Sequence, residues 1–351
     1  MNKKRIAIVG CGRISQRHLN VIKQNSALEL VGVCDIKDER YAPIASSEGV
    51  LGFKDAVEMV STLRPDLVSI LTESGTHASI GVRLAPLVKA LIIEKPMALS
   101  LEDADALIEA CDACGTRLFV VKQNRYNPPI LKLRAAVDSG HFGKMVLGTV
   151  RVRWSRDQSY YDQDSWRGTW ALDGGVFTNQ ASHHIDLLQW LMGPVESVKA
   201  YTATRLVNIE AEDTGVAILK FKNGALGIIE ATTATRPKDL EGSISILGEL
   251  GSVVVGGFAV NKLETWNFSD KKIDALKIDD PSESVPNVYG LGHGAFYSEV
   301  LECLSTGKRA MLDGLEGRKS LEIINAIYQS SSTGQEVHLR YVPHAVRLGR
   351  G

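Results

Sequence analysis

RIAIVGCGRIS, residues 5 to 15, decides the fold of the first half of this chain. A short apolar run ends at Gly10 and Gly12, and helical spacing follows over residues 13–25. Gly10 permits a tight turn, and Gly12 lets a pyrophosphate approach the backbone at a helix N-terminus. Ser15 replaces the third glycine of the usual pattern and is small enough for close packing. The stretch predicts a strand, a phosphate-binding turn and a helix, with a plain loop as the alternative.

The next apolar run, LELVGVCD (28–35), ends in an acidic residue that extends this pattern. Asp35 lies 25 positions after Gly10. A carboxylate there accepts hydrogen bonds from the ribose hydroxyls of NAD and repels the 2'-phosphate of NADP. The alternative is an aspartate that caps a turn. The sequence predicts NAD as the cofactor, and the expected contacts in this region are Gly10, Gly12, Arg13, Ile14 and Asp35.

Residues 5 to 122 continue to alternate short apolar runs with helical stretches. Such runs are typical of strands that helices bury on both faces. Ser100 and Asp103 form a capping box at the start of one helical stretch. We expect an NAD-binding Rossmann domain over residues 1–122, an α/β fold with a doubly wound parallel sheet. Its other expected strands are 66–74, 90–96 and 117–124, and its other expected helices are 77–88 and 101–114.

The second half contains a series of expected strands that alternate apolar and polar residues. Such alternation is typical of a sheet whose two faces meet different surroundings. A face that exposes so much aliphatic surface needs a partner, which predicts a homo-oligomer, a dimer or a tetramer. The expected strands are 146–154, 195–203, 214–222, 225–233 and 243–248.

Composition argues against several classes of protein. The 351 residues suffice for roughly two domains of about 150 residues each. Because 40 basic residues balance 41 acidic ones, the chain gives no support for a nucleic-acid or anionic-membrane partner. No apolar run approaches the roughly 20 residues of a membrane span, and we expect no signal peptide before the first strand. The five cysteines include a lone C-x-x-C, Cys111 and Cys114, so we expect a cytoplasmic, reduced protein without a metal site.

A lysine follows the fourth expected strand, in Glu94-Lys95-Pro96. A lysine at the carboxyl end of such a strand lies where a nicotinamide would bind. The cationic ring would lower the pKa of Lys95 and make it a usable general base. The alternative is a surface lysine that pairs with Glu94.

A second candidate lies in the expected helix 179–192. At helical spacing His183 shares a polar face with Asn179 and Asp186, and an apolar stripe covers the opposite face. Asp186, one turn later, is expected to orient the His183 ring. His184 lies on the flank and is expected to be structural. An ordinary hydrogen-bonded histidine remains the alternative for His183.

Four motifs of this sequence resemble those of the Gfo/Idh/MocA family of oxidoreductases: the glycine turn, TESGTH (72–77), Glu94-Lys95-Pro96 and Trp166-Arg167. The resemblance covers nearly the whole chain. The resemblance implies that residues 123–351 form an α/β domain for substrate binding and oligomerisation, with a large, open-faced, mostly antiparallel sheet. It also implies hydride transfer between a sugar or polyol carbon and NAD. The further cofactor contacts that it implies are Thr72, His77, Glu94, Gln123, Trp166 and Arg167.

One family motif is altered in this chain. The motif usually has an aspartate, three residues and a histidine, and it aligns Asn179 with the aspartate and His183 with the histidine. An amide cannot take a proton, so the base is expected to be Lys95 or His183. Asn179 is expected to hydrogen-bond the substrate. An acidic substrate would suit this amide, because a carboxylate in its place would repel the negative charge.

Residues 151–175, TNQASHH and GLGHGAFYSEV (290–300) resemble one branch of the family. That branch oxidises the 3-hydroxyl of UDP-linked N-acetylglucosaminuronic acid for lipopolysaccharide. The resemblance implies that Lys95 takes the hydroxyl proton while His183 hydrogen-bonds the same oxygen. The alternatives are a dehydrogenase of a free sugar or inositol, and a non-catalytic ligand-sensing relative. The side chains expected to hold the UDP-sugar are Asn179, Arg156, Tyr160, Tyr161, His293 and Tyr297.

Overall fold

A computed structural model describes residues 3–275, 282, 292–339 and 348 of the protein. Their contacts group into two compact units, residues 1–121 with 293–318 and residues 122–292 with 319–351. The first unit thus includes helix α10 (His293–Thr306) and the start of α11 (Gly314–Thr333), although the sequence assigned all of 123–351 to a second domain. None of the helices in the described part of the chain has the length and apolar character to span a bilayer.

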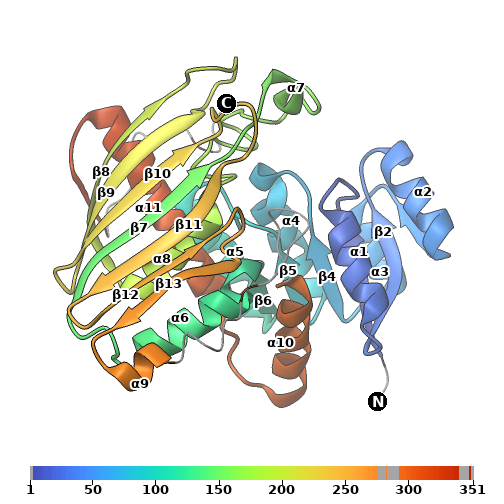
Figure 1. Ribbon diagram of the computed structural model, residues 1–351. Helices are drawn as coiled ribbons and strands as arrows, with labels where there is room; N and C mark the ends of the chain where they lie inside the picture. Colours follow the sequence, from blue (N-terminus) through green and yellow to red (C-terminus); the bar gives the residue numbers. More distant parts are fainter. Residues whose placement is uncertain (1–2, 276–281, 283–291, 340–347, 349–351) are drawn as a thin grey trace. The chain divides into compact units, whose positions relative to one another are not determined.

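The first unit contains a parallel sheet with the strand order β3-β2-β1-β4-β5-β6, drawn in blue and cyan in Figure 1. This arrangement confirms the predicted doubly wound fold. The strand order reverses direction between β1 and β4, and in open α/β sheets ligands bind beyond the carboxyl ends of the strands at such a point. The strands are β1 (Lys4–Val9), β2 (Leu28–Cys34), β3 (Leu51–Phe53), β4 (Leu67–Ile70), β5 (Ala90–Ile93) and β6 (Arg117–Val120).

The three helices predicted for the first unit begin and end close to their predicted limits. Helix α1 buries Ser15, His18, Leu19 and Ile22, the spacing of a single helix face. The Ser100 hydroxyl accepts a hydrogen bond from the Asp103 N–H at 3.1 Å, which confirms the predicted cap. Besides α10, the helices are α1 (Ser15–Gln24), α2 (Asp38–Glu48), α3 (Ala56–Leu63), α4 (His77–Leu84) and α5 (Leu101–Cys114).

The second unit contains an eight-stranded sheet with the order β13-β12-β11-β7-β10-β9-β8-β14. Its described strand pairs are antiparallel except for β7 and β10. This confirms the predicted mostly antiparallel sheet. The strands are β7 (Met145–Arg153), β8 (Val195–Ala203), β9 (Thr214–Phe221), β10 (Leu226–Thr232), β11 (Glu241–Gly248), β12 (Gly251–Gly256), β13 (Lys262–Phe268) and β14 (Val337–His338).

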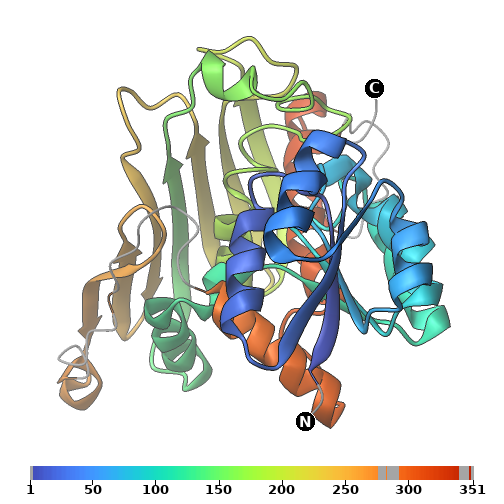
Figure 2. The same ribbon diagram turned by 90° about the vertical axis from the view of Figure 1, so that its right-hand side faces the viewer.

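One face of the eight-stranded sheet packs against helices. Figures 1 and 2 show α8 (Ser182–Met192) and α11 on the same face. Gly148 permits this packing, because a Cβ there would lie 2.7 Å from side-chain atoms of Leu188 and Met192. The other face carries exposed apolar side chains from β8, β9 and β10, which we call the open face: Tyr201, Val216, Ile218, Leu226 and Ile228. The second unit also contains α6 (Pro128–Asp138), α7 (Gln158–Tyr161) and α9 (Lys271–Asp274).

Candidate active site

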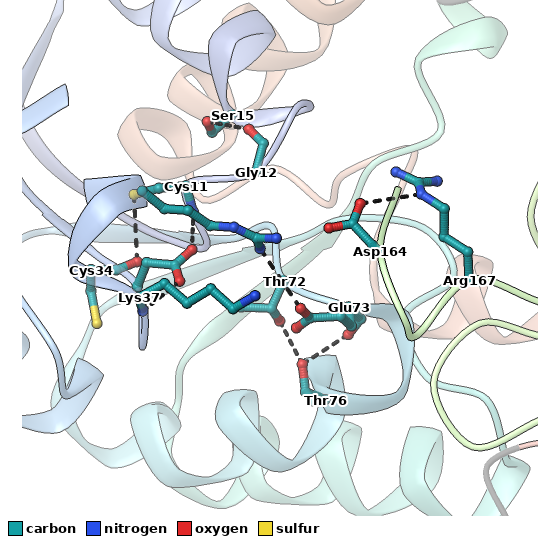
Figure 3. A network of polar contacts seen from close by, with 12 residues as sticks. Cys11, Gly12, Ser15, Cys34, Lys37, Thr72, Glu73, Thr76, Asp164 and Arg167 are labelled. Atoms are coloured by element: carbon teal, nitrogen blue, oxygen red, sulfur yellow. Dashed lines mark hydrogen bonds and ion pairs between the residues drawn. The ribbon is translucent and has the colours of Figure 1, made fainter. Parts of the chain in front are cut away.

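The glycine turn of the first unit has the geometry that the sequence predicts. Gly10 adopts φ +95°, and a Cβ there would lie 2.6 Å from the carbonyl carbon of Leu71, so only glycine fits. A Cβ on Gly12 would instead meet nothing within 4 Å. Ser15 begins helix α1 and donates from its hydroxyl to the Gly12 carbonyl at 2.6 Å (Figure 3). Open space above a glycine at a helix N-terminus fits the pyrophosphate of a dinucleotide. Arg13 and Ile14 lie in this same turn, immediately before the helix.

Asp35 follows β2, and its side chain is hydrogen-bonded to the glycine turn. Its carboxylate accepts hydrogen bonds from the N–H groups of Cys11 at 2.9 Å and Lys37 at 3.0 Å. The carboxylate therefore caps a turn, which was the alternative interpretation. Each carboxylate oxygen can accept more than one hydrogen bond, so this role is compatible with the predicted ribose contact.

The loops that follow β4 and β5 are joined by a buried histidine. The ring nitrogens of His77 lie 2.8 Å from the Pro96 carbonyl oxygen and 2.9 Å from that of Thr72. Burial lowers the pKa of His77. The Thr72 hydroxyl bonds the hydroxyl of Thr76 at 2.7 Å. Because backbone carbonyls face both nitrogens of His77, the side chain fixes the two loops, and its predicted cofactor contact gains no support.

Glu94 directly follows β5 and is buried. Its carboxylate lies 3.0 Å from His18 Nε2 and accepts a hydrogen bond from the Lys95 N–H at 2.9 Å. Glu94 is therefore not the surface residue that the alternative interpretation assumed. His293 Nε2 lies 3.9 Å from the same carboxylate. The ligand atoms of His18, Glu94 and His293 all lie within 4.8 Å of one another, so this group could also hold a metal ion.

Two side chains that were expected to bind the sugar lie inside the first unit. Tyr297 is fully buried, and its hydroxyl contacts His18 Nδ1 at 2.7 Å and Ser69 Oγ at 2.9 Å. His293 is the first residue of helix α10 and is also buried, whereas the sequence predicted a loop there. The structure thus gives Tyr297 protein partners in place of the sugar. His18 was not among the predicted site residues, although its place on the apolar face of α1 was a signal that could have found it.

In the second unit, helix α8 carries His183. Its Nε2 lies 3.2 Å from Gln123 Nε2, so the structure brings together a predicted catalytic residue and a predicted cofactor contact. Asp186 does not orient this ring as predicted. Its two oxygens accept hydrogen bonds from Arg125 Nε at 2.7 Å and Nη2 at 2.8 Å, and both side chains are buried. Asp186 instead anchors α8 to the segment that carries Gln123.

Asn179 lies just before α8 and is held by a carboxylate. Its Nδ2 donates to Asp173 Oδ1 at 2.6 Å, and Asp173 Oδ2 accepts from the Gly168 N–H at 2.8 Å. His184 is fully buried, edge-on to Trp154 with ring centroids 5.8 Å apart. Burial lowers the pKa of His184 to about 4. The structure supports the expected structural role of His184.

Basic and aromatic side chains stack on one another near α7, in what we call the arginine–aromatic cluster: Arg156, Tyr160, Trp166 and Arg167. The Arg167 guanidinium lies 4.6 Å from the Tyr160 ring centroid and 4.5 Å from that of Trp166, and the Arg156 guanidinium lies 5.4 Å from Tyr160. Arg167 Nε donates to Asp164 at 3.2 Å (Figure 3), and Arg156 donates to Asp239 at 3.0 Å. The cluster joins four of the predicted contact residues.

Tyr161 does not join this cluster through its hydroxyl. Its side chain is buried, and the hydroxyl bonds Thr233 at 3.1 Å. Burial raises the pKa of Tyr161 above its ordinary value, away from a proton-transfer role near neutral pH, and the buried side chain belongs to the core. Arg151 and Arg153 pair with Glu230 and Glu241 on the sheet, as expected for a solvated sheet face.

Comparison with known proteins identifies the family. Residues 4–122 match the description "Oxidoreductase family, NAD-binding Rossmann fold", and residues 134–339 match "Oxidoreductase family, C-terminal alpha/beta domain", both from the Gfo/Idh/MocA group. The chain belongs to the Gfo/Idh/MocA oxidoreductase family. Its first domain is thus an NAD-binding Rossmann fold, as predicted.

Two solved structures are similar over nearly the whole chain. The WlbA dehydrogenase from Bordetella pertussis, in complex with NADH and UDP-GlcNAcA, is 42% identical over 97% of this chain and 100% of its own, with a TM-score of 0.89. The WlbA dehydrogenase from Chromobacterium violaceum, in complex with the same two ligands, is 42% identical over 97% of each chain, with a TM-score of 0.91. A D-apiose dehydrogenase from Paraburkholderia graminis is 27% identical over 95% of this chain and 89% of its own.

Proposed function

We propose that this oxidoreductase uses NAD to oxidise the 3-hydroxyl of UDP-linked N-acetylglucosaminuronic acid to a 3-keto group. The observation that carries the proposal is the 42% identity, over 97% of the chain, to two dehydrogenases whose structures hold NADH and UDP-GlcNAcA. The arginine–aromatic cluster supports it, because guanidinium groups bind phosphate and carboxylate and aromatic rings stack on bases. Such a reaction supplies keto sugars for lipopolysaccharide, and its nucleotide-sugar substrate points to the cytoplasm.

Lys95 is the proposed base in this reaction. It follows β5, at the carboxyl end of the parallel sheet. In open α/β folds, ligands bind at this end of the strands. Bound NAD would supply an acceptor for the hydride of the sugar carbon. Lys95 takes the hydroxyl proton, and His183 hydrogen-bonds the same oxygen. Gln123 contacts the His183 ring, and Asp173 holds the amide of Asn179, which is the proposed hydrogen-bond partner of the sugar.

Purified protein mixed with UDP-N-acetylglucosaminuronate and NAD tests the substrate. We expect nicotinamide absorbance to rise and the sugar to lose two hydrogens by mass spectrometry. Lys95→Met should reduce turnover by about 10²–10⁴-fold, the usual contribution of a general base, and should still bind NAD. The matched control is Lys308→Met, because Lys308 lies on the surface. Unchanged turnover in Lys95→Met would remove Lys95 from the mechanism.

A free sugar or polyol is the second candidate substrate. A myo-inositol 2-dehydrogenase from Thermotoga maritima is 29% identical over 74% of this chain and 76% of its own. Activity with inositol or apiose, and none with the nucleotide sugar, would overturn the proposed substrate. NAD binding without reduction by any of them would favour the non-catalytic interpretation.

The open face of the eight-stranded sheet is the proposed contact between copies of this chain. Ile218 is 60% exposed and Leu226 is 56% exposed, and neighbouring strands surround them with further apolar side chains. Monomeric proteins rarely expose so contiguous an apolar patch. Light scattering should give the mass of a dimer or tetramer, and Ile218→Asp should shift it toward the monomer. Leu51→Asp, at an exposed leucine of the first unit, is the control; a monomeric wild type would refute the contact.

A further inference from the structure

A continuous chain of hydrogen bonds inside the first unit ends at the backbone of Lys95. It runs from the Ser69 hydroxyl to the Tyr297 hydroxyl at 2.9 Å, then to His18 Nδ1 at 2.7 Å. His18 Nε2 continues it to Glu94 at 3.0 Å, and Glu94 accepts from the Lys95 N–H at 2.9 Å. The members come from β4, α10, α1 and the end of β5, and all four side chains are buried. We call these four side chains the Glu94 network.

The protonation states of Glu94 and His18 decide which group donates and which accepts at each hydrogen bond. Burial opposes ionisation of Glu94, but the hydrogen bond from His18 Nε2 and the nearby imidazole of His293 outweigh burial and hold the pKa of Glu94 well below its usual range. Burial lowers the pKa of His18, so its ring is neutral near neutral pH. A neutral His18 that donates from Nε2 to the carboxylate must accept at Nδ1 from Tyr297. Burial lowers the pKa of His77, and the charge of Glu94 partly offsets this effect. Burial also raises the pKa of Tyr297 above its ordinary value.

We infer that His18, Tyr297 and His293 are positioning residues that hold Glu94 as a carboxylate, and that this carboxylate fixes the backbone of Lys95 for proton transfer. The inference rests on the proposed function for the role of Lys95. A carboxylate accepts a stronger hydrogen bond from an N–H group than a neutral carboxyl does. A lysine side chain is long and flexible, so fixing its first atoms narrows the positions that its amine can reach.

A metal ion is the competing interpretation of the same side chains. Two histidines and one glutamate are a ligand set that suits a transition metal. However, both ring nitrogens of His18 and both oxygens of Glu94 already have hydrogen-bond partners. Of the three, His293 alone has ring nitrogens for which the described residues provide no hydrogen-bond partner. The contacts therefore favour a hydrogen-bonded network over a metal site.

Substitutions of His18 separate positioning from packing. In His18→Leu, the buried carboxylate loses its main donor and becomes protonated at neutral pH, so kcat should fall by about 10²-fold, the cost of a small misplacement of a catalytic group. Raising the pH ionises Glu94 again, so kcat should recover on the alkaline side, whereas the wild type should lack this acid limb. His18→Gln should restore most of kcat, because its amide nitrogen occupies the place of Nε2. NAD affinity should be unchanged in both variants.

Infrared spectroscopy of the substrate-free protein gives a readout that does not depend on the sugar. His18→Leu should show the carbonyl band of a protonated carboxyl group at neutral pH, and Glu94→Gln in the same background should remove it. If His18→Leu does not fold, Tyr297→Phe should give a smaller change of kcat and its pH profile in the same direction.

The outcomes separate the inference from the function on which it rests. The carboxyl band with no sugar oxidation would support the network and refute the proposed function. A uniform loss of kcat at all pH values, without the band, would overturn the network. Stoichiometric metal in the purified protein, whose removal by a chelator changes the histidine spectra, would also overturn it and assign a metal site.

Discussion

The two glycines of the phosphate-binding turn allow one added methyl group to be compared at two positions. At Gly10 the new Cβ would lie 2.6–2.7 Å from backbone atoms of Leu71 and Thr72, and φ is +95°. The left-handed backbone costs about 1–2 kcal/mol and overpacking adds about 1–3 kcal/mol. Gly10→Ala should therefore lower the free energy of unfolding of the NAD-free protein by about 2–5 kcal/mol.

Gly12→Ala is the matched control, and we expect it to spare the stability of the NAD-free protein but to weaken NAD binding. A Cβ there meets nothing within 4 Å, so the free energy of unfolding without NAD should change by about 0.5 kcal/mol or less. The methyl group would, however, occupy the space through which a pyrophosphate approaches the backbone. NAD at about 100 times its Kd stabilises a native protein by about 2.7 kcal/mol. Gly12→Ala should lose most of this gain.

Urea-induced unfolding with and without NAD, followed by circular dichroism, measures both effects, and calorimetry gives the Kd of NAD directly. Wild-type stability in NAD-free Gly10→Ala would refute the steric argument at the turn. An undiminished gain from NAD in Gly12→Ala would refute the placement of the pyrophosphate.

Substitutions at three further places in the fold test other contacts. Asp35→Ala should weaken NAD binding and relax discrimination against NADP, measured by calorimetry; unchanged affinity for both would refute the ribose contact. Asp186→Ala leaves Arg125 buried without its carboxylate and should cost about 3–5 kcal/mol in urea unfolding, whereas Arg125→Met with Asp186→Leu should recover most of it; equal losses would refute the pairing. Burial raises the pKa of Glu212 to about 7 from the ordinary 4.5, so its protonated form stabilises the fold, and this stability is lost as pH rises from about 4.5 to 7. Glu212→Gln should therefore exceed the wild type by up to about 3 kcal/mol above pH 7 and match it below pH 4.5; parallel pH profiles would contradict this.

In and around the first sheet, the sequence predicted the buried strands and missed elements without a clear buried face. It also did not predict α6, α10, β12 and β13, although each of these buries side chains. Strands β4 and β5 and residues 6–9 of β1 are nearly all apolar, and buried parallel strands have this composition. By contrast, helix α2 buries no residue and contains Pro43, and β3 has three residues, so neither produced a periodic signal.

The site was harder to predict wherever its contacts span the chain. Helical spacing placed Asp186 beside His183, but Arg125, 61 residues earlier, takes both oxygens of Asp186. His18 and Tyr297 are 279 residues apart and meet in the Glu94 network. Local patterns report which face of a helix a residue occupies, and they contain no information on which distant side chain faces it.

The discontinuity of the first unit has a consequence for biosynthesis. Its segments, residues 1–121 and 293–318, are separated by the residues that build most of the second sheet. A ribosome that has released the six strands of the first sheet has not yet translated the helix that carries Tyr297. His18 and Ser69 therefore lack their partner Tyr297 while the 171 residues from 122 to 292 are synthesised. We therefore expect the nascent nucleotide-binding unit to mature late, and residues 4–122 expressed alone to expose a polar seam where α10 belongs.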